Sequence, residues 1–238
     1  MSKLPIGTFI NMSTVVLGSM IGVMLQQVFP ENIQAIVFQA MGLGILILGL
    51  QMSLKLQEGL MVMFIFSLII GGVFGELLGV KALLDNCEIW MKTNFQLGER
   101  QFSEGLIAAL ILFCASPITI VGAIEEGFQN KRELMLIKSA FDGIMAVALA
   151  SSYGIGVLFA ILPMLIVQGG ITLLAGKAKP LFTKNILALI SGIGGVLLIA
   201  LSIKILKLAE FFVVANLLPA LVVCVFVAWG YGRLKVKF

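Results

Sequence analysis

Polar residues concentrate in the stretch 113–142 of a largely apolar chain. It reads FCASPITIVGAIEEGFQNKRELMLIKSAFD and contains a Ser116–Pro117 break, the Thr119 hydroxyl, and Lys138 four residues before Asp142. A carboxylate, hydroxyls and a backbone carbonyl freed by proline are oxygen ligands of the kind that a desolvated small cation requires. The stretch therefore predicts binding of a small ion or polar solute.

The composition places these residues in a membrane. Of the 238 residues, 60% are hydrophobic and 12% are charged, and the mean hydropathy is +1.13. Soluble domains are about 45–50% apolar and about 25% charged. Lipid offers the backbone no hydrogen-bond partner, so segments that cross it are helices unless they close into a barrel of shorter, alternating strands. We expect an all-α, polytopic transmembrane helical bundle of about 7–8 helices.

Apolar runs of about 20 residues, the length that crosses a bilayer, divide the chain into eight segments. These expected spans cover 5–29, 33–54, 60–80, 103–124, 134–152, 154–175, 181–203 and 209–230. The connections are short, so 1–238 forms a single transmembrane domain. The first apolar run resembles a signal peptide, but no polar domain follows it and we interpret it as a retained span.

The order of the spans suggests internal repetition. The similar patterns GILILGLQMS, GIMAVALASS and GVLLIALSIK begin at Gly44, Gly143 and Gly195. We predict a three-plus-three inverted repeat, with repeat A at 5–80, repeat B at 103–176 and a C-terminal helical hairpin at 181–230. The connection 81–102 should form an amphipathic interfacial helix with Trp90 at headgroup level. Gly18 and Gly22 should allow two helices to pack closely.

Counting about 1.5 Å per helical residue places several polar groups at one depth. Asp142 lies roughly 12 Å inside its span, and Asn11, Ser116 and Thr119 lie roughly 7–12 Å from the same membrane face. Lys138 shares a helical face with Asp142 and can pair with it. An ionisable group at this depth needs a partner or a polar cavity, so these five residues are the candidate ion or substrate ligands. Pro117 interrupts the helix that carries Ser116 and Thr119.

The remaining polar residues are weaker candidates. Glu76, Gln51 and Ser151 lie near the ends of expected spans and are secondary candidates for a polar site. Glu125 and Glu126 are expected in a solvated turn. The Lys138–Asp142 pair itself admits a second interpretation, as an ion pair that only holds the helix in place.

The chain contains no histidine, and its cysteines, Cys87, Cys114 and Cys224, show no metal-ligand spacing. We therefore expect no catalytic residues, metal or cofactor, and the protein is not predicted to be an enzyme. A lipid-acting enzyme would need a carboxylate pair, which only Glu125–Glu126 offers. The net charge of +4 reflects basic loops, so we expect no nucleic-acid partner.

Lysine and arginine are more frequent in one set of loops, which predicts that both termini are cytoplasmic. The expected cytoplasmic set is Lys3, Lys55, Lys131, Arg132, Lys177, Lys179, Lys184, Arg233, Lys235 and Lys237, and the external set is Lys81, Lys92, Arg100, Lys204 and Lys207. A chain with so few spans is expected to enclose a path as a homodimer or higher homo-oligomer in the lipid bilayer.

Four stretches resemble a known family of bacterial inner-membrane proteins, the family of YqgA and YdfK, classified as domain of unknown function 554. They are PIGTFINMSTVVLGSMIG at 5–22, AMGLGILILGLQMSL at 40–54, FCASPITIVGAIEEG at 113–127 and KSAFDGIMA at 138–146. The resemblance covers nearly the whole chain. It implies a multi-pass protein of the bacterial inner membrane and carries no residue roles.

Two functions remain open at this point. The polar groups predict a small secondary transporter or ion-conducting protein, with its site between the first, fourth and fifth spans. The alternative is a non-transport membrane protein, such as an assembly partner or a sensor accessory. The short loops leave little soluble surface for such a partner.

Overall fold

The computed structural model describes residues 4–28, 30–95, 102–178, 180–209 and 211–235. All the regular structure within these ranges is helical, which confirms the all-α prediction. The basic residues Lys3, Arg100, Lys179 and Lys237, which entered the orientation count, lie outside the described residues.

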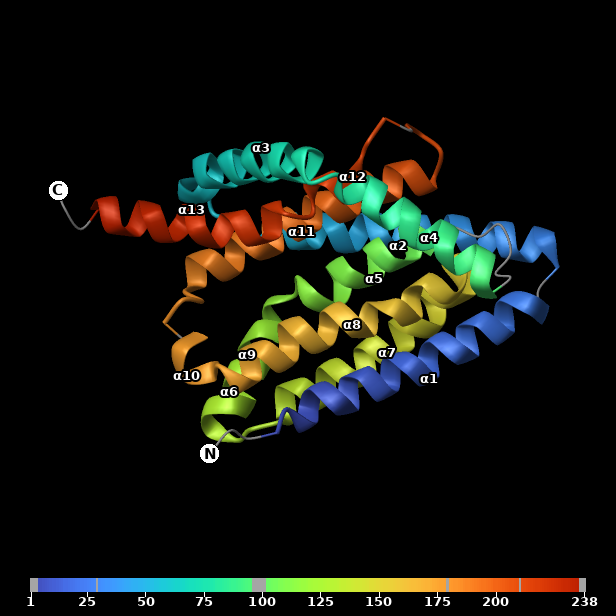
Figure 1. Cartoon of the computed structure of the whole chain (residues 1–238), viewed down its shortest axis with the longest axis horizontal. Helices are drawn as coiled ribbons and strands as arrows, with labels where there is room; N and C mark the ends of the chain where they lie inside the picture. Colours follow the sequence, from blue (N-terminus) through green and yellow to red (C-terminus); the bar gives the residue numbers. More distant parts are fainter. Residues whose placement is uncertain (1–3, 29, 96–101, 179, 210, 236–238) are drawn as a thin grey trace.

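The helices form two groups that lie side by side (Figure 1). The first group consists of α1 (Ile6–Val28), α5 (Phe102–Cys114), α6 (Pro117–Gln129), α7 (Glu133–Tyr153), η2 (Gly154–Ala160), α8 (Ile161–Met164), η3 (Leu165–Gly169), α9 (Gly170–Leu173) and α10 (Ala175–Ala178). The second consists of α2 (Glu31–Ser53), η1 (Glu58–Leu60), α3 (Met61–Leu77), α4 (Val80–Phe95), α11 (Lys184–Ile205), α12 (Val214–Leu217) and α13 (Ala220–Lys235).

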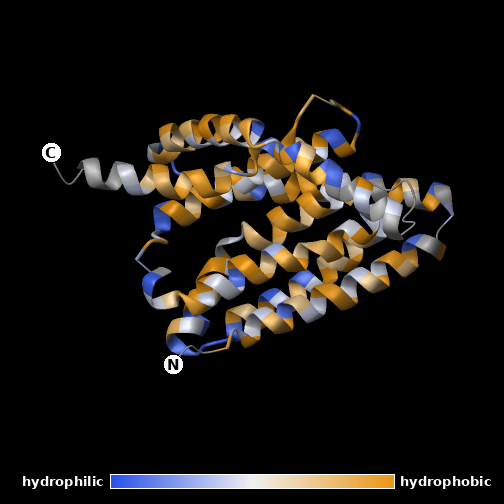
Figure 2. Cartoon of the chain, viewed as in Figure 1, coloured by the Kyte–Doolittle hydropathy of each residue, from blue (hydrophilic) through white to orange (hydrophobic). Residues whose placement is uncertain are grey.

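Helix α11 joins the two groups. It packs against α2, α3 and α13 in its own group and against α5 and α6 in the other. Leu189, Ile193 and Leu197 on this helix are fully buried. The other long helices are mostly apolar along their length (Figure 2). Many of their large apolar side chains are exposed, among them Leu17 and Met24 on α1 and Ile65 and Phe66 on α3, as on helices that face lipid.

Five helical stretches in the described part of the chain are long and apolar enough to cross a membrane: Ile6–Gln26, Ala35–Ser53, Glu58–Leu77, Glu133–Leu173 and Lys184–Ile205. The pair α5 and α6, bent by 54°, passes the same test as one broken span, and Val214–Gly230 is a shorter apolar helix. The protein is therefore a polytopic helical bundle of the membrane type.

The stretch Glu133–Leu173 reverses direction at Gly154, whose φ of 75° and ψ of −150° suit only a residue without a Cβ. Residues Thr14 and Gln26 of α1 bond to Ser139 and Ser152 respectively, so α1 and α7 run in the same direction. Ser19 and Val23 of α1 line one pocket with Ile155 and Leu158, whereas Asn11, nearer the start of α1, bonds to Gln168. The η2–α9 segment therefore runs back against α1 and α7. The stretch thus makes two passes, as the hydropathy predicts.

Close backbone packing ties α1 to α7, as predicted from Gly18 and Gly22. A Cβ at Gly18 would lie 2.3 Å from the Gly143 carbonyl oxygen, and one at Gly22 would lie 2.4 Å from that of Val147. Real Cβ atoms do not approach a carbonyl so closely, so only glycine permits this contact. The contact fixes how α1 and α7 are aligned along their axes.

The two helix groups do not follow the boundaries of the expected repeats. The first span belongs to one group and the second and third spans belong to the other, so repeat A is divided between them. The three-plus-three inverted repeat therefore stays a prediction. The connection after α3 does form a helix, α4, and Trp90 on it is exposed. Figure 1 shows α1 beginning and α13 ending at the same end of the bundle.

Candidate functional site

The candidate site begins with a buried ion pair on α7. Asp142 is 0% exposed and Lys138 is 4% exposed. The Lys138 ammonium donates to Asp142 Oδ1 one helical turn away, the pairing that the four-residue spacing predicts. Asp142 lies nine residues after the first residue of α7, which is roughly 13 Å along the helix axis.

Helix α1 contributes an amide to the same carboxylate. Asn11 Nδ2 donates to Asp142 Oδ2 at 3.0 Å and to Gln168 Oε1 at 3.1 Å. Asn11 is fully buried, and the glycine contact between α1 and α7 sets its level. Both protons of its NH₂ group are therefore used, one on each neighbouring segment.

The break between α5 and α6 is the third part of the chain that contributes to the site, after α7 and α1. Proline has no N–H, so Pro117 leaves the carbonyl of Phe113, four residues earlier, without its helical donor. Thr119 Oγ1 donates to this carbonyl at 2.8 Å and Gln168 Nε2 donates to it at 3.4 Å. Ser116 is the extended residue before α6, is half-buried, and forms no side-chain cap.

Gln168 is the site residue that we did not identify from the sequence. It is fully buried and joins Asn11 to the Phe113 carbonyl from the short π-helix η3. π-helical turns inside helices often occur at functional sites. The available signal was an amide side chain within the apolar run ILPMLIVQGGITLL.

The charges in this network balance. The cluster contains one ammonium and one carboxylate, and the ring of Phe113 lies 5.6 Å from Lys138 Nζ, within the range of a cation–π contact. A buried ion pair is favourable only when further hydrogen bonds satisfy its remaining atoms, and Asn11 supplies one of these. The arrangement can hold one positive charge against Asp142, which Lys138 supplies in this structure.

Three of the five primary candidates, Asn11, Lys138 and Asp142, are joined directly by hydrogen bonds. Thr119 is linked to them through the Phe113 carbonyl and Gln168. The structure does not bring the secondary candidates to this network. Glu76 on α3 accepts a hydrogen bond from Asn216 on α12, and both residues belong to the second helix group, away from Asp142. Ser151 donates to the Ala148 carbonyl within α7, and Gln51 is exposed on α2.

The expectation that Glu126 is solvated is wrong. Its side chain is 1% exposed, and Oε1 accepts from the Gly7 N–H at 2.7 Å and from Arg132 Nε at 3.1 Å. The reason is that α6 continues to Gln129 and carries Glu126 over the start of α1. A carboxylate is favourable there because the first N–H groups of a helix lack partners and carry positive charge.

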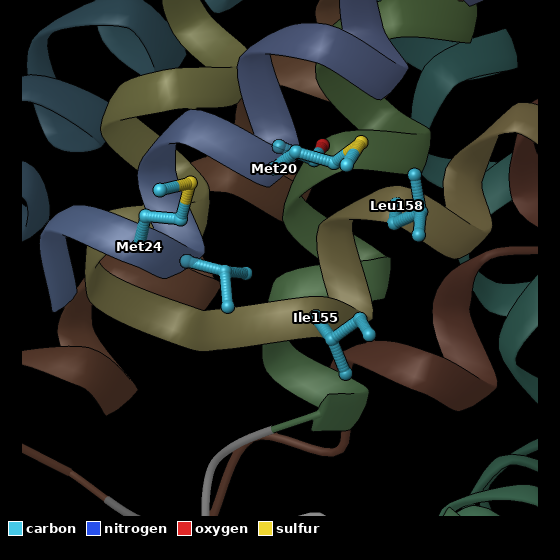
Figure 3. Close-up of a pocket in the computed structure, with 6 residues that line it drawn as sticks. Met20, Met24, Ile155 and Leu158 are labelled. Atoms are coloured by element: carbon cyan, nitrogen blue, oxygen red, sulfur yellow. The ribbon is translucent and has the colours of Figure 1, made fainter. Parts of the chain in front are cut away.

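An apolar pocket of about 200 Å³ lies between α1 and η2. Its lining residues are Ser19, Met20, Val23, Met24, Ile155 and Leu158 (Figure 3). Ser19 follows Asn11 by eight residues, roughly 12 Å along α1. The pocket is therefore separate from the polar cluster. Among the residues described, no three His, Cys, Asp or Glu side chains lie close enough together to hold a metal ion.

The fold and this buried cluster define a helical integral membrane protein with an ionisable site inside its apolar bundle. The chain belongs to the family described as a protein of unknown function, DUF554, whose model matches residues 6–229. It is 31% identical over 221 residues to the uncharacterized protein YqgA of Escherichia coli strain K12, covering 91% of this chain and 93% of the relative.

A second relative is the uncharacterized membrane protein YdfK of Bacillus subtilis strain 168. The identity is 29% over 231 residues, which covers 95% of this chain and 98% of the relative. No solved structure matches the chain. The resemblance noted from the sequence is thus confirmed, and it supports the membrane location of the protein.

Proposed function

We propose that the protein is a small secondary transporter or ion-conducting protein whose cation site is the polar cluster between α1, the α5–α6 break, α7 and η3. One observation carries the proposal. The buried Lys138–Asp142 pair is joined to two further segments by Asn11 and Gln168, at the point where a membrane helix is broken. Discontinuous helices with polar groups at the break form the sites of many secondary transporters.

The ligands around Asp142 are of the type that small hard cations prefer. Besides the carboxylate, the cluster contains the Gln168 amide oxygen and the Phe113 carbonyl oxygen. Asn11 Oδ1 is buried and forms no hydrogen bond with the described residues. In this structure the Lys138 ammonium occupies the position that a bound cation would take beside Asp142. A proton or metal cation that reaches Asp142 can replace the ammonium as the positive charge that balances the carboxylate.

Further features of the proposal follow from the sequence. We place the protein in the bacterial inner membrane with both termini in the cytoplasm. That α1 begins and α13 ends at the same end of the bundle supports termini on one side of the membrane (Figure 1). We propose a homodimer or higher homo-oligomer, and a function other than catalysis. A lipid-acting enzyme would need the carboxylate pair Glu125–Glu126, and Glu126 already accepts hydrogen bonds from Gly7 and Arg132.

The second candidate is a non-transport membrane protein, such as an assembly partner or sensor accessory. The burial of the Lys138–Asp142 pair favours this second candidate, because both charged groups are paired with each other and shielded from water. Such a pair can serve only to hold a helix in one arrangement. The two functions differ in whether Asp142 must remain able to carry charge.

The test is ion flux in proteoliposomes, with H⁺, Na⁺, K⁺ and Li⁺ gradients as probes. Asp142→Asn keeps the shape of the side chain and removes its charge, and we expect it to abolish most of the flux. Glu76→Gln makes the same chemical change at an exposed position in the other helix group and should leave flux unchanged. Wild-type flux in Asp142→Asn would refute the role of the carboxylate. Flux no greater than that of empty liposomes for all four ions would favour the second candidate.

A further inference from the structure

We propose that water and cations reach Asp142 from the end of the bundle where α1 begins, along a polar path between α1, α6 and the η3–α9 segment. This inference rests on the proposed function, because the path gives the transport site its entrance. It adds the side of access and assigns a role to Glu126, Thr8 and Thr172, which lie outside the cluster around Asp142.

The first observation is a set of buried oxygen atoms without partners. Four side-chain oxygens on these three segments are buried and form no hydrogen bond with the described residues: Asn11 Oδ1, Thr8 Oγ1, Glu126 Oε2 and Thr172 Oγ1. Leaving one buried polar group unsatisfied costs about 1–3 kcal/mol, and native proteins contain few such groups. Four of them on adjoining segments indicate a place that water or a polar ligand enters.

The second observation is that these groups form a continuous line. Thr8 precedes Asn11 by three residues on the same face of α1, about 4.5 Å away along the axis. A Cβ at Gly169 would lie 3.9 Å from the Thr8 methyl group, so η3 and Thr8 are in contact. Thr172 lies one turn beyond Gln168, and its carbonyl oxygen packs against Gly127 on α6.

Glu126 stands at the outer end of this line. Its Oε1 is bound by Gly7 and Arg132, whereas Oε2 lies beside Gly7, where a Cβ would be only 2.7 Å away. The Arg132 side chain is 34% exposed and thus connects the carboxylate to the protein surface. The Oε2 atom, which forms no hydrogen bond with the described residues, offers an oxygen ligand to a cation that moves toward Thr8 and Asn11, and the guanidinium holds the carboxylate in place.

The polar line ends on the other side of Asn11. The next buried residue on this face of α1 is Val15, which is 0% exposed. Beyond it, Ser19 Oγ is also buried and has no hydrogen-bond partner in the described part of the chain, but it borders the apolar pocket. Val15 therefore lies between Asn11 and the opposite end of the bundle along this face of α1, so the line of buried oxygen atoms extends from Asn11 only toward the end where α1 begins.

Cysteine labelling tests the path without measuring flux. In a variant whose three native cysteines are replaced by alanine, Thr8→Cys and Thr172→Cys are treated with a membrane-impermeant cationic methanethiosulfonate. This reagent needs a thiolate in contact with water. The matched controls are the neighbouring residues Phe9→Cys and Leu173→Cys, whose native side chains are 47% and 51% exposed on the outer surface of the bundle. All four variants must first elute as monodisperse protein.

We expect Thr8→Cys and Thr172→Cys to react at least about tenfold faster than their neighbours, and only when the reagent is on the side where α1 begins. Equal or slower reaction than the neighbours, or reaction from the opposite side, overturns the path. Labelling as expected without any flux in liposomes keeps the path and refutes transport. Flux without labelling refutes the path and keeps the proposed function.

Discussion

Thr119 donates its hydroxyl proton to the carbonyl of Phe113, 2.8 Å away, across the break between α5 and α6. The break therefore does not leave a carbonyl unsatisfied, because a side chain at the start of the second helix replaces the missing proline N–H. The same carbonyl also accepts from Gln168. The bent span is thus connected to the η3 segment at the level of the ion pair.

We expect Thr119→Val to destabilise the protein, because the substitution keeps the side-chain shape and removes the 2.8 Å hydrogen bond to the Phe113 carbonyl, leaving it the longer bond from Gln168. Loss of one buried hydrogen bond should lower the free energy of unfolding by about 1–3 kcal/mol. Thermal unfolding in detergent measures the effect. The control is Thr93→Val on α4, where the hydroxyl bonds only within its own exposed helix. Equal melting temperatures for the two variants would contradict the role of Thr119.

The ion pair can be tested by single and double substitution. Lys138→Met alone leaves Asp142 buried without its counter-charge and should destabilise the protein by about 3–5 kcal/mol. Lys138→Met combined with Asp142→Leu removes both charges and should restore most of this loss. The unfolding transitions of the wild type and the two variants measure how much of the loss the second substitution restores.

If Asp142 binds the transported cation, the double variant will be stable but inactive in the flux assay. A stable double variant that transports normally would show that the pair serves only the structure. A double variant as unstable as Lys138→Met would contradict the assignment of the loss to an unpaired charge.

Gly18→Ala should separate α1 from α7. The new Cβ would lie 2.3 Å from the Gly143 carbonyl oxygen, so one helix must move. Overpacking of this kind costs about 1–3 kcal/mol, and it should also weaken the bond between Asn11 and Asp142. Gly44→Ala on α2 is the control, because no atom outside its own helix lies within 4 Å of the added Cβ. The melting temperature should fall for Gly18→Ala alone, and an equal fall in both variants would disprove the close contact.

Glu126→Ala should destabilise the start of α1. It removes the acceptor for the Gly7 N–H and the partner of Arg132. A loss of about 1–3 kcal/mol is expected for these buried bonds, and amide hydrogen exchange of Gly7 should accelerate. Glu125→Ala, at the half-buried neighbouring position, provides the comparison. Unchanged exchange at Gly7 would rule out the bond to Glu126.

Much of the cluster could be predicted from the sequence because a helix rises by a constant distance per residue. Depth arithmetic placed Asn11, Thr119 and Asp142 at a common level, and the four-residue spacing paired Lys138 with Asp142. It could not identify Gln168, because depth alone does not show which way a side chain faces on a segment that leaves the α-helical period. Hydropathy placed Glu126 in a turn because it does not report the length of α6.

The neighbours of each helix were also beyond prediction. Apolar membrane helices can pack against one another on any side, since lipid and side chains are equally apolar. The pairing of α1 with α7 depends on backbone contacts at Gly18 and Gly22, whose partners Gly143 and Val147 lie far away in the sequence. Candidate ligands could therefore be named without knowing that α1 and η3 would bring them together.

The π-helical turn at Leu165–Gly169 has a consequence for how insertions and deletions are tolerated. Such a turn contains one residue more than an α-helical turn, so residues on either side of it are out of phase by about 100°. Deleting a single residue there would restore the α-helical period and rotate Gln168 relative to α9. Asn11 would lose its second acceptor although no side chain had been substituted. The length of this segment is thus as much a part of the site as the residues that it carries.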